Sequence, residues 1–362
     1  MKIALIAGGI MEIPPKKSGA IESILWNHKL SLEALGHTVV IFNDRNLRAV
    51  ARQIHGGGFD FVHLHYSEYV SFFLRTLRMP FVTTCHSGYI TNKKKWSIGY
   101  YSVFYDTMRC AGIITLSPYI QKLYADSGYG GFSRVLRNGV DVRNFAVREK
   151  GNGRAICLGR IDSRKRQAWL ADKLRGTDVD LDFVGVIADD AFRADGHQAY
   201  IGSWTKEEVY ENLSGYSSLV LLSAGEAAAL VIPEALAAGL SVVVSRSAAA
   251  NLDEGLPFVT ILPDDVSDPG IIADAIRAQI RDNVSYRREI SEYAKRHFDM
   301  GAVAADYAQI IEEFRSADRA MQTIRIPFRE LPTYLLSKLA ISIKNVLRTL
   351  RTTRKSPTAF PS

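Results

Sequence analysis

The sequence lacks several features that would assign a chain to a broad class. No run of about 18 apolar residues occurs, so no membrane-spanning helix is predicted. Cysteine occurs three times, at Cys85, Cys110 and Cys157, too scattered for a disulfide framework or a metal site. We interpret them as small core residues of a protein in a reducing compartment. No Gly-x-Gly-x-x-Gly follows a strand pattern, which disfavours a dinucleotide-dependent oxidoreductase.

Acidic residues are almost absent from the C-terminal segment. The chain has 362 residues and a formal net charge of +7. Residues 323–362 contain eight basic residues and a single acid, Glu330, so this segment carries the whole net charge. A composition of 47% hydrophobic and 23% charged residues is typical of a globular protein, and the length suggests two domains.

Short apolar runs alternate with helical patterns along most of the chain. The run at 2–8 is interpreted as a buried strand, because it is too short and lacks the flanks of a signal peptide. Further strands are predicted at 38–43, 59–65, 81–86, 112–117 and 133–140, and, after a polar linker at 144–154, at 155–160, 179–186, 200–204, 219–225, 240–245 and 257–262. This alternation predicts an α/β fold of two doubly wound domains with parallel sheets and a cleft between them.

Three segments follow from this pattern. We expect a first domain at 1–148, a second at 149–322 and a basic tail at 323–362. The last helix of the second domain is predicted at 301–320, where it can cross back to the first domain.

Two carboxylates interrupt a small and apolar segment, SAGEAAALVIPEALAAG at 223–239. Burying an unpaired carboxylate is costly, so Glu226 and Glu234 are expected to reach solvent or to face a ligand with hydroxyls. Glu226 follows a predicted strand, and Pro233 suits the first turn of the next helix. The backbone around 228–230 would then lie at a helix N-terminus, which attracts phosphate. Alternatively, Glu234 only complements the helix dipole.

Basic residues follow the first strand of the second series. Arg160 offers a planar fork and Lys165 a point charge, and together they can clamp two phosphates. Arg164 and Arg166 flank Lys165 and are interpreted as surface charges, although either is near enough to reach a phosphate.

Metal ligands are not expected. His63 and His65 alternate on one strand face without a third ligand, so we interpret them as structural, with cleft lining as the alternative for His65. Asp178-Val-Asp180 lies among polar turn residues and is interpreted as a solvated turn. His86 ends a strand pattern and is expected either to face the cleft or to be a satisfied, partly buried histidine.

Together these motifs resemble those of family 4 glycosyltransferases. Glu226, seven residues and then Glu234-Ala-x-Ala-x-Gly resembles the glutamate signature of that family. The segment LGRIDSRKRQ at 158–167 is similar to its Gly-Arg-x-x-x-x-Lys motif. Further similar segments are the glycine loop, first helix and second strand at 13–43, the histidine segment at 81–88, the stretch at 201–226 and the loop at 136–145. The resemblance implies the GT-B fold, with two Rossmann-like domains.

The resemblance also implies retaining transfer of a sugar from a nucleotide diphosphate. Arg160 and Lys165 would stabilise the leaving diphosphate without a metal or any other cofactor, since positive charge must oppose the developing anion. Glu226 would hold the donor sugar, and His86 would support the sugar near the reacting carbon. These four residues form the predicted catalytic set.

The predicted donor-binding set is larger, and the chain departs from the family within it. Glu234 would hold the ribose, and Gly19 would let the first loop approach the donor. Ala228-Ala229-Leu230 stands where the family has Gly-Phe-Gly, which leaves the identity of the sugar open. The donor-binding set consists of Gly19, Arg160, Lys165, Glu226, Ala228, Ala229, Leu230 and Glu234.

The tail is predicted to form a basic amphipathic helix. Its apolar residues fall at helical spacing, at Leu335, Leu336, Leu339, Ile343, Val346, Leu347 and Leu350. The predicted membrane-contacting residues are Lys338, Lys344, Arg348 and Arg351, because basic amphipathic helices lie on anionic lipid. The alternative is a last helix that packs on the protein. A second patch at 92–106 mixes Lys93, Lys94 and Lys95 with Trp96 and tyrosines.

We therefore expect a cytoplasmic enzyme at the inner face of the membrane. It would transfer a sugar from a nucleotide-sugar donor to a membrane-associated glycan or lipid-linked acceptor, in cell-surface polysaccharide synthesis. One alternative is a nucleotide-sugar epimerase or hydrolase on the same fold. Another is a nucleic-acid-binding protein that uses the basic tail, although nothing beyond charge supports nucleic acid as a partner.

Overall fold

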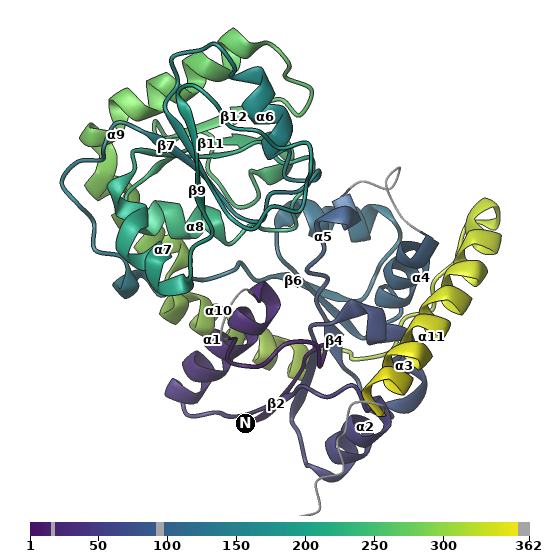
Figure 1. Cartoon of the computed structure of the whole chain (residues 1–362). Coiled ribbons are helices and arrows are strands. Elements are labelled where there is room, and N and C mark those ends of the chain that lie inside the picture. Colours follow the sequence, from purple (N-terminus) through teal and green to yellow (C-terminus); the bar gives the residue numbers. More distant parts are fainter. Residues whose placement is uncertain (16–18, 92–97, 354–362) are drawn as a thin grey trace, which may run out of the picture. The chain divides into compact units, whose positions relative to one another are not determined.

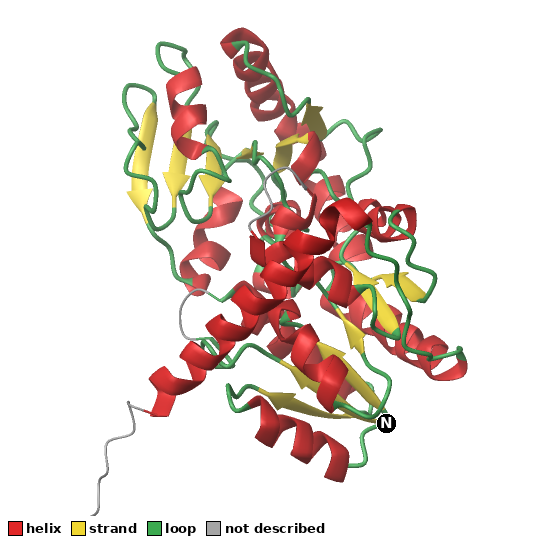
Figure 2. Cartoon of the chain, turned by 90° about the vertical axis from the view of Figure 1, so that its right-hand side faces the viewer, coloured by secondary structure: helices red, strands yellow, loops and turns green. Residues whose placement is uncertain are grey.

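The chain divides into two compact units, each built on its own sheet. The structure is a computed structural model that describes residues 1–15, 19–91 and 98–353. The first unit comprises Met1–Thr115, Ile120–Val135 and Ala308–Ser362, and the second comprises Leu116–Tyr119 and Leu136–Tyr307. Figure 1 shows the elements of each unit in chain order, and in Figure 2 the strands of each unit run among helices.

The first unit contains a six-stranded parallel sheet in the order β2-β1-β3-β4-β5-β6. Its strands are β1 (Lys2–Ile6), β2 (Thr38–Phe42), β3 (Phe61–Leu64), β4 (Val82–Thr83), β5 (Gly112–Thr115) and β6 (Phe132–Val135). Its helices are α1 (Ala20–Ala34), α2 (Leu47–Gly56), α3 (Val70–Thr76), α4 (Ile98–Thr107), most of α5 (Pro118–Asp126) and α11 (Leu331–Thr353).

The second unit contains another six-stranded parallel sheet, in the order β12-β11-β10-β7-β8-β9. Its strands are β7 (Ala155–Leu158), β8 (Leu181–Val184), β9 (Gln198–Gly202), β10 (Ser218–Leu221), β11 (Ser241–Ser245) and β12 (Val259–Leu262). Its helices are α6 (Gln167–Lys173), α7 (Lys206–Asn212), α8 (Val231–Ala237) and α9 (Pro269–Phe298). Helix α10 (Met300–Ser316) begins in this unit and ends in the first.

Both sheets reverse their strand order at one point. In the first unit the reversal lies between β1 and β3, and in the second it lies between β7 and β10. In open parallel sheets of this kind, ligands bind outside the carboxyl ends of the strands at this reversal. The loops that follow these four strands are therefore the places to look for a site.

The second sheet is buried on both faces, as a parallel sheet covered by helices must be. On β7, Ile156 and Leu158 face one core while Ala155 and Cys157 face the other. Cys157, like Cys85 and Cys110, is a free and buried thiol, which confirms the interpretation of the cysteines as core residues. Runs of consecutive apolar residues made the twelve strands predictable, and all twelve are present.

The chain enters the second unit at Leu136, before the expected boundary at 148, and returns to the first unit at Ala308, within the helix that was expected to be able to cross back. Residues 136–148 belong to the second unit, because Phe145 packs into its core and Val140 donates a backbone hydrogen bond to Phe298. The chain returns to the first unit from Ala308 onward, where Phe314 packs edge to face against Phe61 and Phe132. These contacts form between residues far apart in sequence.

Helix α11 belongs to the first unit and lies beside α4 (Figure 1). The Tyr334 hydroxyl donates to Asp106 Oδ1 at 2.8 Å, and the Ser337 hydroxyl donates to Ser102 Oγ at 2.7 Å. Tyr334 and Ser337 are buried, so one face of the tail helix is part of the fold.

Candidate active site

The loops after β7 and β10 bring two cations and a carboxylate together. Lys165 Nζ lies 3.1 Å from Glu226 Oε1, and an Arg164 guanidinium nitrogen lies 2.8 Å from Glu226 Oε2. The Ser223 hydroxyl donates to Glu226 Oε1 at 3.0 Å. Glu226 is 8% exposed, so its charge is paired but keeps a small accessible surface. We call Arg164, Lys165 and Glu226 the β7–β10 cluster.

The electrostatics of this cluster favour an ionised carboxylate. Burial raises the pKa of Glu226, but the positive charges of Lys165 and Arg164 outweigh burial and hold that pKa below its usual value. The cluster therefore has one negative and two positive charges. A net positive charge at the reversal point of the sheet suits an anionic ligand.

Local backbone geometry explains how the β7 loop presents these cations. Asp162 Oδ1 accepts a hydrogen bond from the Lys165 backbone N–H at 2.9 Å, which closes the turn. Arg166 adopts a left-handed conformation at φ 60°, where glycine is normally favoured, and its guanidinium stacks over Trp169. The contact with the Trp169 ring stabilises Arg166 in this otherwise strained backbone conformation.

Arg164 belongs to the β7–β10 cluster, although its sequence position indicated a surface charge near enough to reach a phosphate. The prediction of a surface charge was wrong, because Arg164 pairs with Glu226 and also donates to the Gly225 carbonyl at 2.9 Å. The Ala224 backbone N–H donates in return to the Arg164 carbonyl at 2.8 Å. The only sequence signal was its place beside Lys165.

Arg160 is not part of the β7–β10 cluster. Its guanidinium pairs with Asp162 Oδ2 at 2.9 Å, and its side chain is 67% exposed. Arg164 and Lys165, rather than Arg160 and Lys165, are the two cations that the structure brings together at Glu226. Arg160 remains close to the turn, since its carbonyl accepts from the Gln167 side chain.

Glu234 forms a separate pair. It lies in the first turn of α8, is buried, and forms an ion pair with Lys206 of α7. The preceding backbone at Ala228, Ala229 and Leu230 leads into α8, and the Ala228 carbonyl accepts from Asn138 Nδ2 at 2.9 Å. Because α8 has only seven residues, its terminus contributes less to anion binding than the terminus of a longer helix would.

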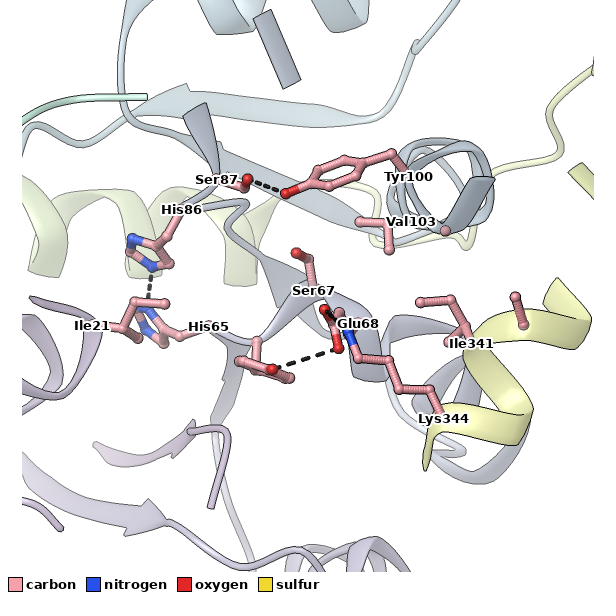
Figure 3. A pocket seen from close by; sticks show the side chains of 13 residues that line it. Ile21, His65, Ser67, Glu68, His86, Ser87, Tyr100, Val103, Ile341 and Lys344 are labelled. Carbon is pink, nitrogen blue, oxygen red and sulfur yellow. Dashed lines mark hydrogen bonds and ion pairs between the residues drawn. The ribbon is translucent and has the colours of Figure 1, made fainter. Parts of the chain in front are cut away.

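His86 lines a cavity of about 380 Å³ in the first unit. Figure 3 shows His65 and His86 on one side of this pocket and Ile341 and Lys344 of α11 on the other. We call it the His86 pocket. It is lined by Ile21, His65, Tyr66, Ser67, Glu68, His86, Ser87, Gly99, Tyr100, Val103, Ala340, Ile341 and Lys344.

The histidines around this pocket are held neutral. His86 Nε2 lies 3.1 Å from His65 Nδ1, and His63 Nε2 lies 2.9 Å from Thr84 Oγ1. Burial lowers the pKa of His86 to about 4 and, together with the charge of His86, that of His28 to about 3. The pKa values of His63 and His65 are also lowered, first by burial. At neutral pH these rings are hydrogen-bonding groups without charge.

The structure places the remaining predicted residues as follows. Gly19 directly precedes α1 in the first unit, where an added Cβ would lie 3.1 Å from Pro15 and 3.2 Å from Glu22. Asp178 and Asp180 precede β8, where they pair with Arg277 and with Arg154 and His197, as expected of a solvated turn. Among the described residues, no three His, Cys, Asp or Glu side chains are grouped to hold a metal ion.

The tail lysines point towards the protein. Lys338 lies 3.5 Å from the buried Asp106, and Lys344 lies 2.9 Å from Glu68. These two pairs differ from the expected lipid contacts, because acidic partners on the first unit hold both ammonium groups. The side chains of Arg348 and Arg351 are outside the described part of the chain, as are Lys93, Lys94, Lys95 and Trp96. Within residues 1–15, 19–91 and 98–353, no helix is both long and apolar enough to cross a bilayer.

Known proteins share this fold. Residues 31–144 match the sequence model of Glycosyltransferase Family 4. The sucrose-phosphate synthase from Thermosynechococcus elongatus superposes with a TM-score of 0.68 at 17% identity, over 88% of this chain and 100% of that one. The structure of Anabaena HepE in complex with UDP and glucose has a TM-score of 0.68 at 16% identity, over 86% and 100%.

A third similar structure is the apo form of the lipopolysaccharide outer core galactosyltransferase WaaB, with a TM-score of 0.62 at 14% identity, over 86% of this chain and 99% of that one. A comparison with curated proteins finds no match. The sequence match to the family covers residues 31–144, most of which belong to the first unit, and the likeness to solved structures extends over both sheets. Residues 31–144 are thus similar to Glycosyltransferase Family 4, and the two six-stranded parallel α/β sheets give the chain the GT-B fold of these solved structures.

Proposed function

We propose that the chain transfers a hexose from a UDP-sugar to an acceptor at a membrane surface, with retention of the anomeric configuration. The observation that carries this proposal is the β7–β10 cluster, in which Lys165 and Arg164 hold Glu226 at the reversal point of the second sheet. The choice of a UDP-sugar is supported by the likeness to HepE, whose structure contains UDP and glucose.

The cluster is suited to a diphosphate leaving group. As the bond between the sugar and the diphosphate breaks, negative charge grows on the departing oxygens. Lys165 and Arg164 supply two positive charges against one carboxylate, and the exposed Arg160 is available on the same turn. These side chains bind and orient the diphosphate, and their charge stabilises it as it leaves.

The carboxylates of Glu226 and Glu234 are proposed to accept hydrogen bonds from the hydroxyl groups of the donor. Glu226 is ionised and can accept hydrogen bonds from sugar hydroxyls on the small surface that it exposes. Glu234 has the same chemistry next to Lys206 and is the candidate for the ribose hydroxyls. Gly19 and the backbone of 228–230 are proposed to contact the donor through main-chain atoms.

His86 is proposed to support the sugar near the reacting carbon. Because burial keeps its pKa near 4, it is neutral at pH 7 and can donate one hydrogen bond while accepting another. The attacking hydroxyl passes its proton to the departing phosphate oxygen on the same face, which accounts for retention.

The membrane part of the proposal rests on α11. Leu335, Leu336, Leu339 and Ile343 are each more than half exposed, which is unusual for four large apolar residues on one helix. Lys338 and Lys344 are paired with acids of the first unit, but residues 345–362 contain four further basic residues and no acid. Each basic residue near an anionic bilayer contributes about 1 kcal/mol. We propose that α11 lies on the inner face of the membrane by this apolar stripe, while its opposite face packs on α4.

The test of the proposed activity is donor turnover with and without an acceptor. Purified protein is incubated with UDP-glucose, UDP-galactose and UDP-N-acetylglucosamine, and released UDP is measured with and without membrane lipid extract. A transferase releases UDP rapidly only when the extract is present, and the sugar of the donor is then recovered on lipid. Equal UDP release with and without the extract indicates a hydrolase instead. If no UDP is released from any of the three donors, the proposal is contradicted.

A further inference from the structure

Histidines lie together where the first sheet reverses its strand order. His63 lies in β3, His65 directly follows that strand, and His86 lies in the loop after β4. The ring centroids of His63 and His65 are 3.8 Å apart, and those of His65 and His86 are 5.4 Å apart at an interplanar angle of 21°. His63 and His65 are buried, whereas His86 is partly exposed. Of these three rings, His86 is therefore the one that a ligand can reach.

Backbone hydrogen bonds and packing hold the ring of His65 in place. The His65 backbone N–H donates to the Ile6 carbonyl at 2.9 Å, and the Thr84 backbone N–H donates to the Leu64 carbonyl at 3.0 Å. His28 of α1 packs against His65, with ring centroids 6.1 Å apart. Because the His65 side chain is enclosed by these elements, its orientation towards His86 is set by the fold.

The hydrogen bonds of His63 show which of its two ring nitrogens carries the proton. The Thr84 hydroxyl donates to the Ile114 carbonyl at 2.7 Å, so Thr84 Oγ1 accepts from His63 Nε2 at 2.9 Å. His63 Nε2 therefore carries a proton. In a neutral imidazole, the hydrogen bond of one nitrogen thus determines what the other nitrogen can offer.

The same reasoning assigns the proton of His65. His65 Nδ1 lies 3.1 Å from His86 Nε2, so one of these two nitrogens donates to the other. His65 Nε2 is buried and has no hydrogen-bond partner within residues 1–15, 19–91 and 98–353. If Nε2 carried the proton, a buried N–H would lack an acceptor, and such donors are rarer in proteins than buried acceptors without a donor. The proton of His65 therefore lies on Nδ1 and is donated to His86 Nε2.

We propose that His65 is a positioning residue that fixes His86 with its proton on Nδ1. His86 is neutral at pH 7, and its Nε2 accepts from His65, so its single proton is on the other nitrogen. His86 then presents an N–H donor to a hydroxyl or ring oxygen of a bound sugar. It has no free lone pair with which to take the proton of an attacking hydroxyl. This inference rests on the proposed function, in which His86 contacts the sugar, and adds the direction of that hydrogen bond.

The test reads the positions of the ring protons directly. Full-length protein is labelled with nitrogen-15 in its histidine rings, and long-range proton–nitrogen NMR spectra at pH 7.5 distinguish protonated from unprotonated ring nitrogens. Each resonance is assigned by its loss in a single variant. His65→Phe keeps an aromatic ring but removes the hydrogen bond to His86. His28→Phe is the matched control, because His28 is a similarly buried neighbour of His65 outside the His65–His86 pair.

The inference predicts that His65 and His86 both carry their proton on Nδ1 in wild type and in His28→Phe. In His65→Phe, His86 should shift towards the form protonated on Nε2. The kcat for sugar transfer should fall about fivefold to tenfold in this variant, as for one neutral hydrogen bond lost from the transition state, and stay near wild type in His28→Phe. His65→Asn, whose amide N–H can lie near the position of Nδ1, should restore most of the kcat.

A wild-type spectrum in which His86 carries its proton on Nε2 would overturn the inference, and this spectrum decides even if His65→Phe does not fold. An unchanged His86 tautomer in folded His65→Phe would also overturn it, whether or not kcat falls, because a loss of activity alone would indicate a merely structural role. Transfer by wild type is measured in parallel. If wild type uses no UDP-sugar, the proposed function fails, while the spectra still decide the assignment of His65.

Discussion

Replacing Lys165 by alanine separates its proposed catalytic role from its structural one. Lys165 forms one ion pair, with Glu226 at 3.1 Å, and is mostly buried. Without it, Glu226 keeps Arg164 at 2.8 Å and Ser223 at 3.0 Å, so no carboxylate is left unpaired. The loss of one charged hydrogen bond should therefore lower the free energy of unfolding by about 1–2 kcal/mol.

The effect on transfer should be larger. A positive charge that opposes the leaving diphosphate acts mainly in the transition state, and removing one such group typically lowers kcat by about 10²–10³-fold, or roughly 3–4 kcal/mol. The assay measures kcat for sugar transfer and the midpoint of urea unfolding in Lys165→Ala. Arg277→Ala is the control, since Arg277 forms only exposed pairs with Asp178 and Asp274. Wild-type turnover in Lys165→Ala, or a loss of activity that merely follows a loss of folded protein, would refute the reasoning.

Three other predictions follow from the structure. Arg164→Ala should weaken UDP binding by at least about tenfold in calorimetry, because its charge is proposed to contact the diphosphate. Unchanged affinity would show that Arg164 has only a structural role. The buried rings of His28 and His86, with pKa values of about 3 and 4 against 6.5, bind fewer protons when folded, so the free energy of unfolding is highest above pH 6.5 and falls as the pH is lowered towards 4. Urea unfolding at pH 7.5 and 5 checks this, and His28→Phe should flatten the dependence. The double variant Leu335→Ser with Leu339→Ser should reduce flotation with vesicles containing phosphatidylglycerol while leaving the melting temperature within a few degrees, because both side chains are exposed. Equal flotation of the double variant and wild type would contradict the proposal that these exposed leucines contact the membrane.

Residues 218–221 and 241–245 show why the fold was predictable. Both are continuous apolar or small runs in strands buried on both faces, and such runs are typical of parallel sheets. The alternation of these runs with helical patterns along the chain predicted two parallel sheets. The unit boundaries were less predictable, because Phe145 and Phe314 each pack into a unit other than the one in which sequence position would place them.

The candidate site was predictable in part. Lys165 and Glu226 stand in recognisable motifs, and the structure brings them into contact across 61 positions of sequence. Arg164 had no such signal: whether it faces solvent or Glu226 depends on the turn made by Asp162 and on the carbonyl of Gly225. The same holds for α11, whose periodicity indicated an amphipathic helix but not which side packs. That side is decided by Asp106, a residue 228 positions before Tyr334.

Calorimetric titration with UDP and with uridine tests the central claim most directly. The claim is that Lys165 and Arg164 bind the diphosphate through their charges. We predict that wild type binds UDP at least about a hundredfold more tightly than uridine, that EDTA leaves this ratio unchanged, and that Lys165→Ala reduces it strongly. Equal affinity for UDP and uridine in wild type, or a ratio that Lys165→Ala leaves intact, would contradict the account.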